Sequence, residues 1–271
     1  MSLVTISGGA GSGIEQIARL VAEDAGIELY DDRRLEEEGR RMGIHSEELK
    51  GLGEKPPSLL DSLRYNPELY LDLLESVVYE VSRSGQGVII GNGSQLLLKD
   101  FGCALHVLIH APEAYRIRQL VDRQGLSERA AQKMIHKSDH ERRGFMRFAF
   151  HMDSDDLSLY DLVLNTQKMG DTGAAKLILE ALRSQAIQEC SLTALDSMDR
   201  MSLAKRVQAA LLSENYVFTQ FHIEVHEKGV VQLTGVTTTE EDKRRMVEST
   251  RKVPGVSEVR EEVSILRGGR Y

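Results

Sequence analysis

The sequence predicts an α/β protein, in which a parallel β-sheet covered by helices on both faces is followed by a smaller α+β domain. Three observations indicate this. Over residues 1–185, short and nearly continuous apolar runs alternate with helical patterns, which is typical of buried parallel strands joined by helices. The first of these runs ends in a loop of glycine, alanine and serine. After about residue 200 the pattern changes to paired strands in which polar and apolar residues alternate.

The first part of the chain carries five predicted strands and six predicted helices. The strands are residues 4–6, 27–30, 88–90, 105–109 and 162–164. The helices are residues 14–25, 32–42, 67–84, 112–124, 127–150 and 171–186. Between them, residues 45–67 contain three prolines with several glycines and serines, which indicates an irregular insertion. We therefore expect a first domain over residues 1–185.

A second, smaller domain is predicted over residues 200–267, after a linker at 186–199 where the first pattern is lost. Its predicted elements are a helix at 200–213, a strand at 217–226, a turn at 227–229, a strand at 230–236, a helix at 239–252 and a strand at 256–266. This αββαβ order, with an antiparallel hairpin, describes an α+β domain. Its length is sufficient for an independent but modest core.

The composition is that of an ordinary globular protein, with 41% hydrophobic and 28% charged residues and a net charge of −8. The negative charge lies in the first 199 residues, and this acidic bulk argues against general nucleic-acid binding. No apolar run approaches 18 residues, and no secretory signal is recognisable. Cys103 and Cys190 fit no metal or redox spacing. We therefore expect reduced thiols and a cytoplasmic location.

The glycine-rich loop comes directly after the first predicted strand and before the first predicted helix. Residues 3–13 read Leu-Val-Thr-Ile-Ser-Gly-Gly-Ala-Gly-Ser-Gly. Backbone N–H groups at such a loop, together with the helix dipole, form an anion site, so the loop predicts phosphate binding. Gly8 and Gly13 have the spacing of the Walker A glycines, but Ile14 and Glu15 stand where that pattern has Lys and Ser or Thr. A plain βα turn, or a loop that has lost its ligand, stays an alternative.

Further motifs follow in a fixed order along the first domain. Residues 105–112 form a strand leading into a helix that carries Arg116, residues 137–143 read Lys-Ser-Asp-His-Glu-Arg-Arg, and residues 160–166 read Tyr-Asp-Leu-Val-Leu-Asn-Thr. Together with the loop, with Tyr30-Asp31 and with Gly-Val-Ile-Ile-Gly-Asn-Gly at 87–93, this order resembles the cytidylate kinase-like family of P-loop nucleoside monophosphate kinases. The resemblance covers residues 1–185 and implies a P-loop three-layer domain with a parallel sheet.

The resemblance also implies roles for particular residues. The donor phosphates of ATP would lie on the loop residues Gly8, Gly9, Ala10, Gly11, Ser12 and Gly13. Arg116 and Arg142 would contact phosphates as catalytic residues, while Asp31, Asp139 and Arg143 would bind the substrate. Phosphoryl transfer needs concentrated positive charge and groups that position both substrates, which agrees with these residue types. The Mg²⁺ expected with ATP would be held mostly by phosphates and water.

Plainer explanations remain for several of these residues. Asp139 and Arg142 lie three apart and share a helix face, so they could equally form solvated surface ion pairs. Asp31 follows a strand and could simply cap the next helix. His136 and His140 have a spacing that could hold a metal, but an exposed polar helix face is the better interpretation, so no metal site is predicted.

The loop also departs from the pattern of the family that it resembles. Members typically have Arg-Gln before the glycines and Gly-Arg after them, where this chain has Gly8-Gly9 and Ile14-Glu15. Positive groups that could bind phosphate are therefore missing, and Arg19, Arg33 or Arg34 are the candidates to replace them. Two functions remain open: an ATP-dependent kinase acting on CMP or dCMP, or a catalytically weak or inactive nucleotide-binding and sensing protein. A purely structural role is the remaining alternative.

The C-terminal part resembles a BON domain. The matching residues are Gly-Val-Val-Gln-Leu-Thr-Gly at 229–235 and Val-Pro-Gly-Val-Ser-Glu-Val at 253–259. Domains of this kind are associated with phospholipid, small-ligand or protein contact. The resemblance therefore implies a regulatory module that contacts protein or phospholipid, or that joins copies of this chain into a homo-oligomer.

Overall fold

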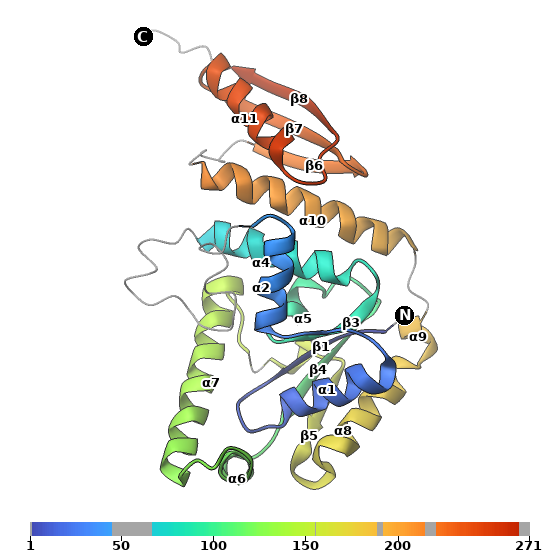
Figure 1. Ribbon diagram of the computed structural model, residues 1–271, viewed down its shortest axis with the longest axis vertical. Coiled ribbons are helices and arrows are strands. Elements are labelled where there is room, and N and C mark those ends of the chain that lie inside the picture. Colours follow the sequence, from blue (N-terminus) through green and yellow to red (C-terminus); the bar gives the residue numbers. More distant parts are fainter. Residues whose placement is uncertain (1, 45–66, 155, 189–191, 215–220, 266–271) are drawn as a thin grey trace.

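The computed structural model describes residues 2–44, 67–154, 156–188, 192–214 and 221–265. Figure 1 shows a helix-covered sheet and, beyond the long helix α10, a second and smaller sheet. This arrangement confirms the predicted fold class. The insertion predicted at 45–67 and the first residues of the strand predicted at 217–226 lie outside the described residues, apart from the last residue of the insertion. The boundaries 1–185, 186–199 and 200–267 stay predictions.

The larger sheet has five parallel strands in the order β2-β3-β1-β4-β5. The strands are β1 (Ser2–Gly8), β2 (Leu29–Tyr30), β3 (Gln86–Ile90), β4 (Ala104–His110) and β5 (Leu162–Asn165). Each predicted strand is present. Because β1 lies in the centre, its loop emerges at the middle of the edge formed by the carboxyl ends of the strands, where open parallel sheets bind ligands.

Helices cover both faces of this sheet, as predicted. They are α1 (Ile14–Ala25), α2 (Asp32–Arg41), α4 (Pro67–Ser82), α5 (Ser94–Leu97), α6 (Glu113–Gln124), α7 (Glu128–Phe150), the 3₁₀ turn η1 (Leu157–Leu159), α8 (Thr166–Leu182) and α9 (Gln185–Gln188). Successive side chains of β1 point to opposite faces, so Leu3 joins a core with α4 and α7 while Val4 joins a core with α1 and α8.

The helices α6 and α7 form a hairpin with a small core of its own. Leu120 of α6 packs with Ala131 and Ile135 of α7. The Ser127 hydroxyl accepts a hydrogen bond from the Ala130 N–H (3.3 Å) and so caps α7. This hairpin determines where the motif at 137–143 lies relative to Arg116.

The smaller domain has the predicted αββαβ order. Its elements are α10 (Leu192–Ser213), β6 (Phe221–Glu227), β7 (Val230–Thr237), α11 (Glu240–Lys252) and β8 (Glu258–Ile265). Strand β7 pairs antiparallel with β6 and parallel with β8. The first helix begins at Leu192, earlier than the predicted residue 200, and therefore runs through part of the predicted linker.

Helix α10 packs against both units (Figure 1). Its Met198 belongs to the core of the larger sheet, whereas Leu203, Val207 and Leu211 belong to the core of the smaller one. A helix with two apolar faces gives no single-sided apolar pattern in the sequence, which explains why its start was missed.

The polar contacts between α10 and α4 centre on Lys205. Its Nζ lies 2.8 Å from Asp72 Oδ1 and 2.6 Å from Glu75 Oε2. These carboxylates raise the Lys205 pKa, although burial alone would lower it. The Ser202 hydroxyl also donates to the Ser76 carbonyl (3.0 Å). The two units are therefore joined by a half-buried ionic contact as well as by apolar packing.

Two further expectations concern the whole chain. Cys103 is disulfide-bonded, which corrects the expectation of a reduced thiol at this position. Cys190 lies outside the described residues. In the part of the chain that the structure describes, none of the helices combines the length and the apolar character needed to cross a membrane.

Candidate functional site

The glycine-rich loop connects β1 to α1 at the centre of the sheet edge. Inside the loop, the Ser12 N–H donates to the Gly9 carbonyl (3.1 Å). The Thr166 hydroxyl, at the start of α8, donates to the Ser12 carbonyl (2.9 Å). Gly11 has a φ of +78°, a left-handed conformation that glycine adopts without strain. Local turns and an anchor from α8 therefore fix the loop.

The loop presents donors that have no acceptor. Among the described residues, the backbone N–H groups of Gly11, Gly13, Ile14 and Glu15 make no hydrogen bond. The Ser12 side chain is 1% exposed, and its hydroxyl likewise has no partner. Orphan donors at a helix N-terminus attract an anion, and their geometry therefore fits phosphate oxygens.

Arg116 of α6 reaches across to this loop. Its Nε donates to the Ala10 carbonyl (2.8 Å), and its Nη1 and Nη2 donate to the two oxygens of Asp139 on α7 (2.9 and 2.7 Å). A side chain at Gly9 would collide with this Arg116–Asp139 pair, and a Cβ at Gly11 would lie 2.6 Å from the Arg116 carbonyl oxygen. Glycine is therefore required here because the arginine lies against the loop.

A cavity of about 460 Å³ opens between the loop, α6 and α7, which is a usual size for a small-molecule site. Six residues predicted for phosphate or substrate line it or belong to its loop wall: Gly9, Ser12, Arg116, Asp139, Arg142 and Arg143. Its apolar wall includes Leu157 and Val163, which are 58% and 43% exposed. Neither was predicted as a site residue, although Val163 belongs to the quoted motif at 160–166. The structure thus brings together residues that are far apart in the sequence.

The two arginines of α7 differ in their surroundings. Arg142 Nη1 donates to the Ser154 carbonyl (3.4 Å) beyond the end of α7. For Arg143, no hydrogen bond or ion pair occurs within the described ranges, yet it lines the same cavity. Arg143 is therefore the cation of this cavity that is most available to an anionic ligand.

Contacts from Ser138 and Asp171 also support the loop, and they were not predicted from the sequence. The Ala10 N–H donates to the Ser138 hydroxyl (3.3 Å), which ties the loop to α7. The Asp171 carboxylate, 2.7 Å from Arg123 Nη1, lies against Gly13 at the start of α1. Ser138 belongs to the quoted motif at 137–143, whereas no sequence signal placed Asp171 near the loop.

Asp31 serves a different purpose in this structure. Its carboxylate accepts a hydrogen bond from the Arg34 N–H (2.8 Å) and caps α2. It is not among the residues lining the 460 Å³ cavity. Its predicted part in substrate binding therefore has no support from the geometry of this cavity and stays a prediction.

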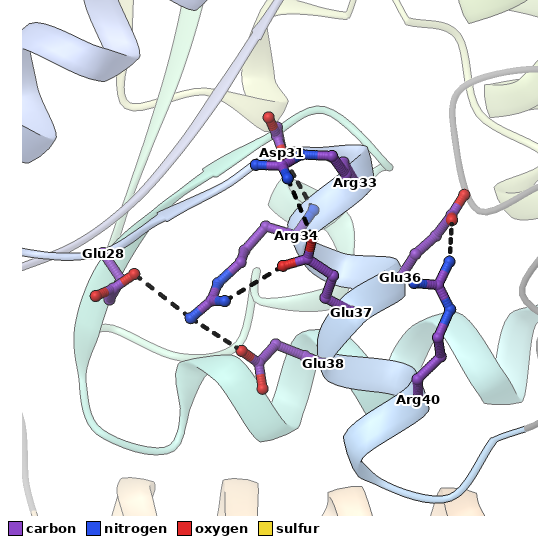
Figure 2. A network of polar contacts seen from close by, with 8 residues as sticks. All are labelled: Glu28, Asp31, Arg33, Arg34, Glu36, Glu37, Glu38 and Arg40. Carbon is purple, nitrogen blue, oxygen red and sulfur yellow. Dashed lines mark hydrogen bonds and ion pairs between the residues drawn. The ribbon is translucent and has the colours of Figure 1, made fainter.

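The arginines expected to replace the missing loop cations lie elsewhere (Figure 2). Arg34 directs its guanidinium at Glu28 (3.7 Å), Glu37 (3.4 Å) and Glu38 (3.2 Å). Arg33 pairs with Glu37 (3.2 Å). These carboxylates therefore pair with the positive charges of Arg33 and Arg34.

Arg19, the third candidate, donates to Gln16 Oε1 (3.5 Å) on the exposed surface of α1. It lines a groove with Glu28 and Tyr30, beside the start of β3. None of the three arginines therefore lines the cavity, and the cations that do line it come from α6 and α7.

A buried histidine lies within strand β4, outside this cavity. His106 on β4 is 7% exposed, and its ring Nδ1 is hydrogen-bonded to the Thr5 hydroxyl (2.9 Å). Its backbone N–H donates to Asp161 Oδ2 (2.8 Å). Burial lowers the pKa of the imidazole, and the negative charge of Asp161 opposes that effect. We assign it a structural role.

No group of three or more His, Cys, Asp or Glu side chains able to hold a metal occurs in the described parts of the chain. His136 lies 3.1 Å from Glu113 and is exposed, as the surface interpretation predicted.

Comparison with known proteins agrees with the geometry. Residues 3–168 match the sequence profile of the cytidylate kinase-like family, and residues 200–267 match that of the BON domain. Cytidylate kinase of Pyrococcus horikoshii is 25% identical over 182 residues, covering 66% of this chain and 88% of the relative. Cytidylate kinase of Staphylothermus marinus is 26% identical over 182 residues, covering 66% and 96%.

A solved structure from Eubacterium ventriosum, described as an uncharacterized protein, superposes with a TM-score of 0.53 at 19% identity. It covers 68% of this chain and 100% of its own length. At this identity the likeness supports the fold alone.

Proposed function

This chain belongs to the cytidylate kinase-like family, and we propose that it transfers the γ-phosphoryl group of ATP to a nucleoside monophosphate, with CMP or dCMP as the acceptor. The observation that carries this proposal is the cavity in which a loop with unpaired amides meets Arg116, Asp139, Arg142 and Arg143. Positive charge and unpaired N–H donors in one cavity are what a phosphoryl transfer requires.

In this proposal, the oxygens of the donor phosphates accept hydrogen bonds from the loop amides and from the Ser12 hydroxyl. Arg142 and Arg143 neutralise charge on the transferring group, and Asp139 orients the acceptor nucleotide. A phosphate oxygen of the acceptor attacks the γ-phosphorus as the bond to the β-phosphate oxygen breaks, so no covalent enzyme intermediate is needed. Bound Mg²⁺ would supply further positive charge between the donor phosphates.

The test is formation of ADP from ATP that depends on CMP and Mg²⁺, measured with purified protein. We expect Arg142→Ala to reduce turnover at least about a hundredfold, because a cation that meets charge in the transition state is removed. Arg147→Ala is the matched control, since Arg147 is an exposed residue five positions further along α7. Absence of turnover with CMP, dCMP and the other common monophosphates would reject the kinase proposal.

A second candidate function is nucleotide sensing without turnover. It is favoured by the Arg116 contacts, because Asp139 and the Ala10 carbonyl already occupy three of its five N–H donors and the carboxylate pairs its charge. With Ile14 and Glu15 in the loop, a shortage of available cations would impair the transition state more than ground-state binding. The signature of sensing is a rise in melting temperature with ATP, ADP, CMP or CDP and no release of ADP.

The C-terminal domain enters both proposals as a regulatory module. Helix α10 packs on α4 of the larger unit and also supplies core residues to the smaller one. Contact of this domain with protein, phospholipid or a second copy of the chain is a proposal that rests on the match to the BON domain. Size-exclusion chromatography with light scattering tests the homo-oligomer. A cytoplasmic location, suited to nucleotide substrates, likewise stays a proposal.

A further inference from the structure

A second cavity lies where the two domains meet, away from the loop. Its volume is about 220 Å³. The larger unit contributes Met42, Gly43 and Ile44 after α2 and Leu73 of α4. The remaining walls are α10 and the end of α11. A Cβ at Gly43 would lie 3.4 Å from the Pro254 ring, so the two units are in direct contact at the rim.

The interior of this interdomain cavity is mainly apolar. Met42, Leu73 and Val253 are 8%, 4% and 7% exposed. Ala209 and Ala210 of α10 leave the space open because their side chains are short. At roughly 30 Å³ for each water-sized group, the cavity has room for about seven such groups, close to the size of a short-chain carboxylate.

The charged groups of the cavity leave a positive excess. Arg206 Nη1 donates to the Pro254 carbonyl (2.8 Å), while its buried Nε has no hydrogen-bond partner. Burial lowers the Arg206 pKa, and the charges of Glu80 and Asp199, neither of them within ion-pair distance of it in the described residues, act in the opposite direction. Lys252 makes no ion pair within those residues, and Glu214 accepts a hydrogen bond from Ser249 (2.7 Å). Among the residues that line the cavity, two cations thus accompany one carboxylate.

We propose that this cavity binds a small organic monoanion, a carboxylate on a short aliphatic chain, with its head at Arg206 and Lys252. One excess positive charge matches one negative charge, and a charge-assisted hydrogen bond to a partly desolvated guanidinium is strong. The apolar walls accept the aliphatic chain. Since both domains line the cavity, the ligand stabilises their docked arrangement.

Hexanoate is the probe, with hexanol and hexylammonium as matched ligands of equal chain length. In the full chain, we expect hexanoate to shift the methyl NMR signals of Met42 and Ile44 saturably and to raise the melting temperature. Hexanol should bind at least about tenfold more weakly, because it lacks the charge, and hexylammonium should not bind. Equal binding of the three compounds would overturn the assignment of an anion site.

Two pairs of variants locate the site. Lys252→Gln should weaken hexanoate binding at least about threefold, whereas Arg251→Gln, at the neighbouring exposed residue, should leave it within about twofold. Ala210→Met should fill the cavity and abolish binding, whereas Ala204→Met, on the same helix at a different groove, should not. No saturable shift at about 10 mM hexanoate, a concentration that detects a millimolar site, would overturn the proposal. These readouts do not depend on kinase activity.

Discussion

The ion pair between Arg116 and Asp139 can be tested by removing one charge with little change in shape, in the variant Asp139→Asn. The carboxylate receives two hydrogen bonds from the guanidinium, of 2.7 and 2.9 Å, and the two side chains are 12% and 21% exposed. Such a pair lies between an exposed ion pair and a fully buried one. We expect the free energy of unfolding to fall by about 2 kcal/mol, the usual contribution of a hydrogen bond to a charged group.

For a unit of this size, that loss lowers the melting temperature by roughly 4–8 °C. The assay is urea unfolding of the wild type, Asp139→Asn, Arg116→Met and the double variant, from which the coupling free energy between the two residues follows. We expect a coupling of about 1.5 kcal/mol. The control is Asp122→Asn, at an exposed aspartate of α6 that makes no side-chain hydrogen bond or ion pair within the described residues. A coupling below about 0.5 kcal/mol would show an ordinary surface ion pair and refute this reasoning.

Three more predictions concern the loop and the sheet. Glu15→Gln should tighten ATP binding several-fold in calorimetry, because it removes a negative charge from the first turn of α1. Glu23→Gln, at the other end of α1, is the control and should leave ATP affinity unchanged. Unchanged ATP affinity in Glu15→Gln would contradict a phosphate site at this loop. Gly11→Ala should abolish nucleotide binding and lower the free energy of unfolding by more than the control Gly26→Ala does. Gly26 has a similar φ (+66°), but no atom lies within 4 Å of the added methyl, so only about 1 kcal/mol should be lost there. Equal decreases in the free energy of unfolding would exclude the predicted collision at Gly11. Burial lowers the His106 pKa from 6.5, so the unfolded chain binds a proton first as the pH falls, and the free energy of unfolding should decrease below about pH 6.5. His106→Gln should make this decrease smaller in urea unfolding at pH 7.5, 6.5 and 5.5. An unchanged pH dependence in the variant would reject this explanation.

Much of the fold could be predicted because the signals are local. Each strand of the larger sheet is a short apolar run, and α1 was predicted with the observed ends, Ile14–Ala25, since glycine precedes and follows it. In α8 the predicted start at residue 171 corresponds to the kink at Gly170, with a short helical segment before it. The start of α10 was wrong because its two apolar faces serve two cores.

The candidate site was predictable as a set of residues but not as an arrangement. Motif order identified Arg116, Asp139, Arg142 and Arg143, and the structure places all four around one cavity. Whether Arg116 points at phosphate or at Asp139 depends on the packing of α6 against α7, which no spacing in the sequence encodes. For the same reason Arg34, plausible as a substitute cation, is in fact engaged by the carboxylates around it.

The contacts of Arg116 connect the two candidate functions. A guanidinium that holds Asp139 with one N–H of each terminal nitrogen has only one further N–H on each for phosphate, and its charge is already paired with the carboxylate. In the kinase proposal Asp139 also orients the acceptor, so an acceptor that takes over this carboxylate would release Arg116 towards the donor phosphates. Binding of the two substrates is then coupled through one ion pair. The coupling is reciprocal, because each substrate must raise the affinity for the other by the same factor. A sensor that binds only one nucleotide would leave the pair intact and would lack this coupling.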